Sequence, residues 1–401
     1  MLQYHVDYGG RRGWAVHPHA SEDTVRIITL IMAGGEGGRM GALTKNRPKP
    51  ALPFAGVYRL IDFPLSNCVH SGLSDVWVLE QFAPFVLNAH LANGRPWDLD
   101  RTYGGLQIIP PYTDKAENEG GWHAGNADAL YRNRRAIRDF KPDLVLILSA
   151  DHVYTCDYRV VIEQHQATKA DLTLVTTRVR REEAHRFAVV ETAADKRVTA
   201  FAYKPDEPTS DEVTTEIFVY SAAALLDTLD ELVAEGGGAP EDADLKDYGD
   251  ALLPRLVERG KVYAFPFDGY WRDVGVIPDY WQAHQDMLAA APPLQLDDPA
   301  WPILTFGAQR MPARIAAGAE VRDSLIGPGC RIAGTVERSV LGPGVVVEAG
   351  ARVVDSIVFN DAHIRADVVV QRAIVDSAAD VAADAGQADG EITVIEGGVQ
   401  R

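Results

Sequence analysis

A glycine-rich segment with basic neighbours is the strongest chemical signal in the sequence. Residues 33–41 read Ala-Gly-Gly-Glu-Gly-Gly-Arg-Met-Gly and directly follow an apolar run. Closely spaced glycines let backbone N–H groups converge on an anion without obstruction by a Cβ atom. The pattern is neither a dinucleotide-binding fingerprint nor a P-loop, and a glycine-rich turn with surface cations is the alternative. The candidate phosphate ligands are Gly34, Gly35, Gly37, Gly38, Arg39 and Lys49.

Two aspartates far apart in the chain are candidate metal ligands. Asp151 follows the apolar run 144–148, and Asp273 lies in Tyr-Trp-Arg-Asp-Val-Gly. A carboxylate at the end of a strand can hold Mg²⁺ between phosphate oxygens. Together with a basic glycine loop, such a pair suits transfer of a nucleotidyl group. For Asp151 a helix N-cap is the alternative. We expect His152 to be structural, because a phosphate-monoester nucleophile needs no general base.

Three single residues each allow two interpretations, one functional and one in which the residue only packs in the fold or lies on the surface. Lys204 follows a strand-like run and could pair with a monophosphate, or be a solvated surface lysine. Trp122 could shield a base or gate a site, or pack in a loop. His363 lies in the C-terminal repeat, where an acyltransferase would use a histidine, but a surface residue is expected there.

The elements that position these residues alternate between strands and helices from Val25 to about His284. Strands are expected at 26–33, 76–79, 144–148 and 172–176, and helices near 67–70 and over 127–140. This alternation predicts a mainly parallel sheet covered on both faces. Ligands of such sheets bind beyond the carboxyl ends of the strands. The glycine segment, the segment after Leu79 and Asp151 should therefore lie on one side.

Composition limits the partners of the protein. The 401 residues carry 39 Lys and Arg against 57 Asp and Glu, a net charge of −18, which argues against nucleic acid or anionic lipid as partner. The longest apolar stretch near the N-terminus is too short for a membrane span, and residues 1–24 do not have a signal-peptide pattern, so an N-terminal extension is expected. Three cysteines at no metal-like spacing predict a cytoplasmic protein with reduced thiols.

The C-terminal part has a different period. Prolines and acidic residues over 291–310 indicate a linker, and small apolar residues then recur at steps of five or six. Leu341, Val358 and Val375 are spaced by 17 residues. The pattern favours a triangular β-helix over 311–386, followed by a tail at 387–401, with an irregular β-sandwich as the alternative. Each coil has an open edge, which favours stacking on a partner subunit or on the first domain.

These motifs, in this order, resemble the sugar-1-phosphate nucleotidyltransferases, most closely the bacterial glucose-1-phosphate adenylyltransferases. The resemblance runs from about Ile27 to Val381. The matching stretches are Met32–Arg39, Arg47–Ala51, Tyr58–Asn67, Ala150–Tyr154, Lys204–Pro205 and Tyr270–Gly275.

The resemblance implies an α/β fold: a nucleotidyltransferase domain with a Rossmann-like mixed sheet over 25–290, then a left-handed parallel β-helix, commonly in a homotetramer. It implies that ATP and α-D-glucose 1-phosphate give ADP-glucose and pyrophosphate, with Mg²⁺, for glycogen synthesis. Carried over by position, Arg39, Lys49 and Asp151 are catalytic, and Asp151 and Asp273 bind Mg²⁺. The nucleotide would contact the glycine loop, Arg39, Lys49, Gln81, Trp122, Gly125 and Asp128.

The positions that depart from the family gather at the implied sugar pocket. That pocket would be lined by His123, Ala188, Tyr203, Lys204 and Thr214, and the family usually has Glu at Tyr203 and Gly at Glu216. A pocket that loses a carboxylate acceptor discriminates its sugar differently. The reaction type is thus better defined than the sugar. The alternatives are another sugar 1-phosphate, such as an amino sugar, or a weakly active regulatory paralogue.

Overall fold

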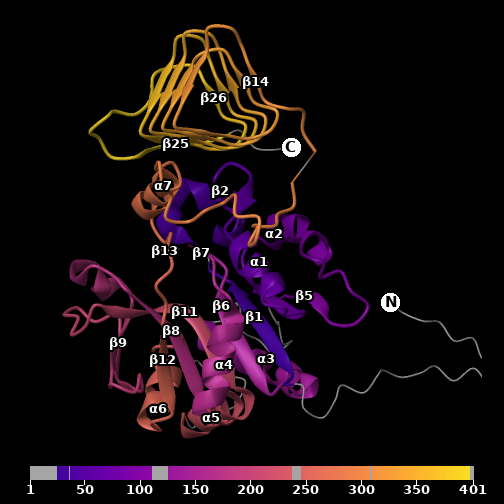
Figure 1. The fold of residues 1–401 in the computed structure, drawn as a ribbon, viewed down its shortest axis with the longest axis vertical. Helices are drawn as coiled ribbons and strands as arrows, with labels where there is room; N and C mark the ends of the chain where they lie inside the picture. Colours follow the sequence, from indigo (N-terminus) through magenta and orange to yellow (C-terminus); the bar gives the residue numbers. More distant parts are fainter. Residues whose placement is uncertain (1–24, 36, 111–124, 237–244, 308, 398–401) are drawn as a thin grey trace, which may run out of the picture.

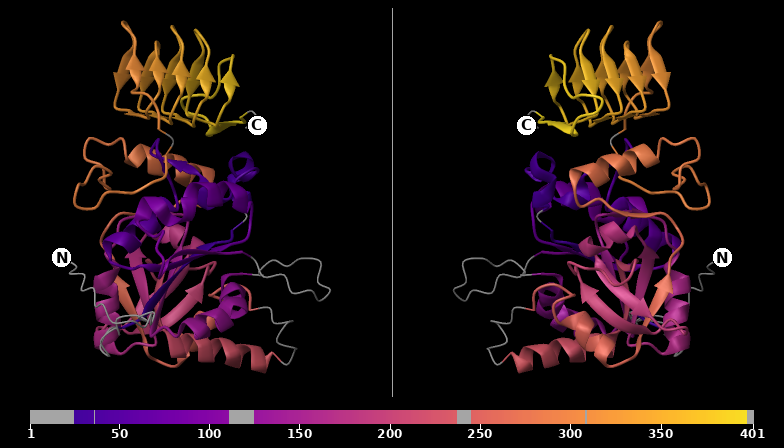
Figure 2. Two further views of the ribbon diagram at one scale, coloured as in Figure 1. Left: turned by 90° about the vertical axis from the view of Figure 1, so that its right-hand side faces the viewer. Right: turned by 90° about the vertical axis from the view of Figure 1, so that its left-hand side faces the viewer.

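The computed structural model describes residues 25–35, 37–110, 125–236, 245–307 and 309–397. They form an α/β domain and a triangular β-helix that stands on one end of it (Figure 1). Figure 2 shows the β-helix from the side, with its strands stacked as parallel rungs above the first domain.

The α/β domain is built on a nine-stranded mixed sheet. Its strands are β1 (Ile27–Ala33), β4 (Asp75–Glu80), β5 (Gly105–Ile109), β6 (Leu144–Ser149), β8 (Leu172–Arg178), β9 (Ala188–Thr192), β10 (Val198–Tyr203), β11 (Glu212–Ser221) and β12 (Val262–Pro266). β1 pairs in parallel with β4 and β6, and β4 with β5. β11, however, runs antiparallel to β6, β8 and β9. β9 and β10 also pair antiparallel, whereas β8 and β12 pair in parallel. The mixed sheet that the family resemblance implies is thus confirmed. The mainly parallel sheet expected from strand–helix alternation is wrong around β11, because that alternation cannot reveal a long strand that returns through the middle of the sheet.

Helices cover both faces of this sheet. The alternation of β1 explains why: Ile28 and Leu30 pack into one apolar cluster and Ile31 into another. The first face is covered by α3 (Asn126–Phe140), α5 (Ala222–Glu235) and α6 (Leu252–Glu258), and the second by α1 (Asp62–His70), α2 (Pro84–Leu91) and α4 (Tyr158–Thr168). Short 3₁₀ helices lie at Gly38–Thr44, Lys49–Ala51, Ala92–Trp97 and Arg181–Arg186, and β2 (Pro53–Phe54) pairs with β3 (Tyr58–Arg59). No described helix combines the length and apolarity needed to cross a membrane.

The β-helix has the repeat that its sequence predicts. Leu341, Val358 and Val375 lie in register on neighbouring strands of one face. Its three sheets are made of β14 (Arg314–Ile315), β17 (Arg331–Ile332), β20 (Val346–Val347), β23 (His363–Ile364) and β26 (Asp380–Val381); of β15 (Glu320–Arg322), β18 (Thr335–Glu337), β21 (Arg352–Val354) and β24 (Val369–Gln371); and of β16 (Leu325–Ile326), β19 (Val340–Leu341), β22 (Ile357–Val358), β25 (Ala373–Val375) and β27 (Thr393–Ile395). Because β27 pairs in parallel with β25, the predicted tail 387–401 in fact contains part of the last coil.

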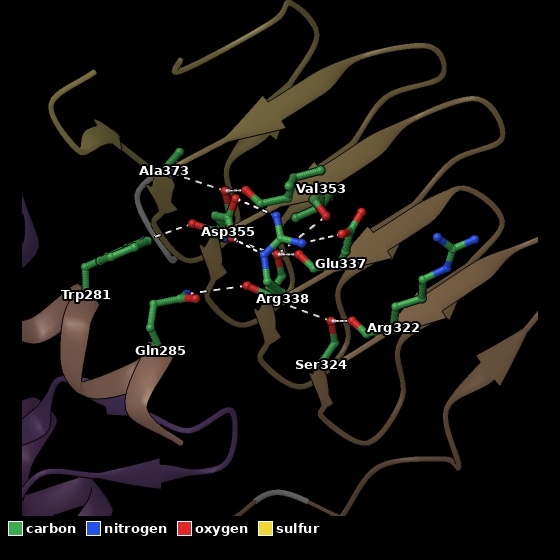
Figure 3. A network of polar contacts seen from close by, with 12 residues as sticks. Trp281, Gln285, Arg322, Ser324, Glu337, Arg338, Val353, Asp355 and Ala373 are labelled. Atoms are coloured by element: carbon green, nitrogen blue, oxygen red, sulfur yellow. Dashed lines mark hydrogen bonds and ion pairs between the residues drawn. The ribbon is translucent and has the colours of Figure 1, made fainter. Parts of the chain in front are cut away.

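The two domains meet at α7 (Ile277–Asp286). The indole Nε1 of Trp281 donates a hydrogen bond of 2.8 Å to the carbonyl of Asp355, and Gln285 Nε2 donates one of 3.4 Å to the carbonyl of Arg338. Figure 3 shows these bonds beside the ion pair of Arg338 with Asp355 on the edge of the β-helix. An ion pair of 2.7 Å between Arg47 and Asp376 adds a second link. The β-helix therefore docks through specific polar contacts as well as apolar ones.

The segment predicted as a linker, 291–310, packs on the α/β domain. Leu294 and Ile303 are buried. Trp301 Nε1 donates a 2.9 Å hydrogen bond to Asn67 on α1.

Candidate active site

The glycine loop leaves β1 at the carboxyl edge of the parallel strands. Gly37 has φ +70°, and a Cβ atom there would lie 3.0 Å from Thr44 Cγ2. Thr44 also donates a 2.9 Å hydrogen bond to the carbonyl of Gly37, which fixes the turn. A Cβ at Gly35 or Gly38 would meet no described atom within 4 Å. Gly41, at the end of the loop, also has a positive φ, of +53°. The loop thus has two glycines that its backbone requires, and two others, Gly35 and Gly38, whose open surroundings leave room for a ligand.

Lys49 lies at the centre of the site. Its side chain is largely buried, and its Nζ lies 2.6 Å from Asp151 Oδ2 and 3.3 Å from Asp273 Oδ1. Burial alone would lower the pKa of Lys49, but the two carboxylates outweigh it and raise the pKa above its usual value. The ammonium is therefore charged and bridges the two predicted metal ligands.

A two-stranded sheet brings the distant aspartates together. β7 (His152–Tyr154) pairs antiparallel with β13 (Trp271–Asp273), with Asp273 opposite His152. His152 Nε2 lies 3.7 Å from an oxygen of each aspartate, and Ser149 Oγ donates a 2.5 Å hydrogen bond to Asp151. Burial would raise the pKa of Asp151, but Lys49, His152 and Ser149 together hold it below the usual range. Both carboxylates thus face the same cation from neighbouring strands.

His152 itself is buried and oriented by the backbone. Its Nδ1 lies 3.2 Å from the carbonyl oxygen of Thr215, and its ring packs edge-on to Trp271. A ring held in this way contacts both aspartates without reaching open solvent. This placement fits the structural role expected from the sequence.

Three neighbouring cavities extend from this centre. The central one contains Arg39, Lys49, Asp151 and Asp273. A second, of about 780 Å³, is lined by predicted nucleotide-binding residues Gly34, Gly35, Gln81 and Gly125. Met32, Gly35 and Asn126 line both, so the two are continuous.

Asp128 does not reach these cavities. Its side chain is fully buried on α3, and Oδ2 forms a 2.7 Å ion pair with Arg132. Its binding of the nucleotide stays a prediction, and in this structure its side chain supports the start of α3. Trp122 and His123, also predicted to contact substrates, lie outside the described residues.

The third cavity coincides with the predicted sugar pocket. Its lining includes Ala188, Tyr203, Lys204 and Thr214. Tyr203 donates a 2.6 Å hydrogen bond from its hydroxyl to Asp247, and Lys204 Nζ donates one of 2.9 Å to Tyr203. The position that usually has Glu in the resembling family thus carries a tyrosine that is already bonded within the protein.

Sequence reasoning missed two charged lining residues of this cavity, Arg186 and Asp247. Arg186 is paired with Asp279 of α7, and Asp247 accepts from Tyr203. Nothing local in the sequence marks either of them. Glu216, which the sequence marked by its departure from the family's glycine, also lines the cavity and lies in β11 with φ +57°.

The fold and the cleft are those of a nucleotidyl transferase. Residues 28–290 match the family model "Nucleotidyl transferase", and residues 308–387 match "GlmU-like, C-terminal hexapeptide". The second match agrees with a left-handed β-helix.

Curated relatives narrow the class. A glucose-1-phosphate adenylyltransferase of Bacillus thuringiensis (strain Al Hakam) is 41% identical over 88% of this chain and 92% of its own. One of Thermosipho africanus is 41% identical over 81% of this chain and 77% of its own. The chain belongs to the glucose-1-phosphate adenylyltransferase family, which confirms the resemblance seen in the sequence.

Proposed function

We propose that the protein transfers the adenylyl group of ATP to a hexose 1-phosphate, with α-D-glucose 1-phosphate as the first candidate. The products are ADP-glucose and pyrophosphate, for glycogen or α-glucan synthesis. The observation that carries the proposal is the pairing of β7 with β13. This pairing gathers Asp151 and Asp273 around Lys49, between the glycine loop and the cavity that contains Lys204.

The residues of the cleft suit an in-line displacement. A phosphate oxygen of the sugar phosphate attacks the α-phosphorus of ATP, a new P–O bond forms, and the bond to the β-phosphate breaks to release pyrophosphate. The glycine loop and Arg39 would hold the triphosphate, and Lys204 the sugar phosphate. Lys49 would neutralise charge that develops on the reacting phosphate. Positioning and charge stabilisation supply most of the catalysis in such transfers.

Mg²⁺ is the cofactor that we propose for this site. Asp151 and Asp273 are hard oxygen donors that both contact the Lys49 ammonium. Within the described residues no group of three or more acidic, histidine or cysteine side chains could hold a metal ion, so substrate phosphates would have to complete this site. One or two carboxylates completed by substrate phosphates are the usual protein contribution to a Mg²⁺ site. When bound, the ion supplies Lewis-acid stabilisation of the phosphate charge. To admit it, the Lys49 ammonium must move away from the carboxylates.

The test is release of pyrophosphate from ATP and glucose 1-phosphate by the purified protein. We expect Asp151→Asn and Asp273→Asn each to lower turnover by about a thousandfold or more, since each removes a metal ligand. Asp227→Asn, an exposed position on α5, is the matched control and should keep full activity. Full activity of Asp151→Asn would overturn the proposal. Wild-type protein that gives no turnover alone would favour a regulatory paralogue.

Two further proposals concern the assembly of the protein and its location in the cell. The first coil of the β-helix has an open edge, where Met311 and Ile315 are exposed. We propose that copies associate there, as a homotetramer in the cytoplasm. Light scattering of the purified protein would give the mass of the assembly, and a monomer would contradict the proposal.

A further inference from the structure

Glu216 interrupts the long central strand of the sheet at the sugar cavity. On β11, Thr214 lies opposite Thr176 of β8 and Phe218 opposite Leu174, so the register shifts between them. Thr215 stays inside the bulge, fully buried, and donates a 3.0 Å hydrogen bond to the carbonyl of Val175. A β-bulge of this kind re-aims a side chain and is common beside active sites. Here it directs Glu216 toward the cavities, two of which it lines.

The backbone of Glu216 is unfavourable for its residue type. Its φ of +57° lies in the left-handed region, which glycine adopts freely and a residue with a Cβ does not. Such strain persists where the surrounding structure holds it and gathers at functional sites. A glycine would fit the backbone of the bulge better than a glutamate. The reason for a glutamate at this position therefore lies in its side chain.

The charged groups around Glu216 indicate which kind of partner its carboxylate lacks. The acidic side chains of Asp151, Asp273 and Asp247 line these cavities with it, as do the basic side chains of Arg39 and His152. Lys49 is occupied by Asp151 and Asp273, Lys204 bonds to Tyr203, and Arg186 pairs with Asp279. Within the described part of the chain no hydrogen bond or ion pair satisfies the Glu216 carboxylate. A positively charged donor from a ligand would be favoured here.

We infer that Glu216 determines which sugar the pocket accepts, by pairing its carboxylate with an ammonium group on the ring of an aminohexose 1-phosphate. This inference rests on the proposed nucleotidyl transfer, with the sugar seated in the cavity of Ala188, Tyr203 and Lys204. Lys204 would take the phosphate of the sugar, and Glu216 the substituent at the opposite side of the ring. The step transfers the same adenylyl group and releases the same pyrophosphate. The ammonium takes no part in the bond changes.

The experiment compares sugar selectivity in Glu216→Gln and the wild type. The substrates are glucose 1-phosphate and its four analogues with an amino group at carbon 2, 3, 4 or 6. For at least one analogue we expect the ratio of its kcat/KM to that of glucose 1-phosphate to fall about tenfold or more in Glu216→Gln, because a charge-assisted pair becomes a neutral one. The N-acetylated form of that analogue, which has no charge, should show no such change.

Two further variants separate recognition from folding. Glu216→Gly removes the carboxylate and relieves the strain, so selectivity should fall as in Glu216→Gln while the midpoint of thermal unfolding stays equal or rises. Glu191→Gln, at an exposed position of β9, is the matched control and should leave selectivity unchanged. If Glu216→Gly unfolds at a clearly lower temperature with unchanged selectivity, the residue is structural and the inference is wrong.

Three other outcomes would overturn either the inference or the proposed function. A selectivity change of less than twofold for all four analogues overturns the inference. An equal loss of kcat/KM with amino and neutral sugars makes Glu216 a general hydrogen-bond acceptor and overturns the ammonium assignment. If the wild type releases pyrophosphate with none of the substrates, the proposed function fails. Calorimetric binding of the amino analogues to wild type and Glu216→Gln then tests the pairing by itself.

Discussion

The proposed phosphate end and the proposed sugar end of the cleft differ in how their charged side chains are paired. At the phosphate end, the carboxylates of Asp151 and Asp273 already share the ammonium of Lys49 at 2.6 and 3.3 Å. At the sugar end, Glu216 reaches the cavity from a strained bulge with no ion pair among the described side chains. The first region is organised before substrate arrives, whereas the second leaves one charge for the substrate to satisfy.

This difference separates catalytic power from selectivity. At the phosphate end the two carboxylates are held in place around a positive charge, which Lys49 supplies here and a metal ion would supply once the ammonium moves away. Charged groups that are positioned in advance are what transition-state stabilisation requires. A group without a partner instead penalises every ligand that cannot satisfy it. Substitutions at the phosphate end should therefore lower turnover with all sugars alike, and those at the sugar end should change the order of preference.

The largest effect is expected at Lys49. Lys49→Gln should lower turnover by about a hundredfold or more, because one charge-stabilising donor is lost. The same variant should bind Mn²⁺ or Mg²⁺ more tightly in the absence of ATP, since the ammonium no longer competes for the two carboxylates. Steady-state kinetics and calorimetric metal titration measure the two effects, with exposed Lys45→Gln as the control. Weaker metal binding would instead mean that Lys49 holds the carboxylates in position.

A smaller effect is expected in the glycine loop. Gly37→Ala places a Cβ at φ +70° against Thr44, so the turn should shift and ATP should be held less well. We expect about a tenfold rise in KM for ATP and no change in sugar preference. Gly260→Ala, which has φ +79° in a turn away from the cleft, isolates the effect of backbone strain alone. A changed sugar preference in Gly37→Ala would break the separation between the two ends.

Tyr203 should have a modest effect, confined to the sugar. Tyr203→Phe removes the hydroxyl that donates to Asp247 and accepts from Lys204, so the lysine is less firmly placed. Loss of one such bond predicts a rise of about three- to fivefold in KM for the sugar phosphate, with KM for ATP unchanged. Tyr263→Phe on β12 is the control. An equal rise for both substrates would mean that the hydroxyl supports the cleft as a whole.

The smallest effect on turnover is expected at Glu80, a buried carboxylate that lines none of the three cavities. Burial raises its pKa from 4.5 to about 7, and Asn88 offsets only part of this. The folded state therefore retains a proton that the unfolded state releases, and the stability of the wild type falls as pH rises from about 4.5 to 7. At pH 8, Glu80→Gln should raise the free energy of unfolding by about 1–3 kcal/mol.

The difference between Glu80→Gln and the wild type should vanish near pH 4, where both states are protonated. Denaturant unfolding at the two pH values measures it. Sugar preference should not change, which would show that burial of a carboxylate alone does not set selectivity. Equal stability of the two proteins at pH 8 would contradict the assignment.

The repeat domain was the most predictable part of the molecule. Leu341, Val358 and Val375, which are equally spaced in the sequence, pair with one another on neighbouring strands of one face. The spacing predicts this register because each coil repeats the same short-range pattern. The phosphate end was also foreseen, since its glycines, Lys49 and Asp151 belong to contiguous motifs at strand ends. The meeting of Asp151 with Asp273 depends on the long-range pairing of β7 with β13, which the topology argument did not include. Asp273 was proposed from its own motif and from the family resemblance.

The sugar end could not be derived in the same way. Asp247 contacts Tyr203 across 44 residues, and no pattern in the sequence near either residue predicts this contact. The bulge at Glu216 depends on how β11 registers with β8, which a single strand does not encode. Asp128 shows the converse: its motif was recognisable in the sequence, but the burial of its side chain on α3 was not.

Helix α7 connects the distal domain to both parts of the cleft. Asp279 near its start pairs with Arg186 at the sugar cavity, and Asp286 at its end pairs with Arg272, the neighbour of Asp273 on β13. Between them, Trp281 is bonded to the carbonyl of Asp355 in the β-helix. A rotation of the β-helix that carries α7 with it would therefore act on Arg186 and on β13 together, so that contact with a neighbouring copy at the rungs would reach both parts of the cleft through one helix.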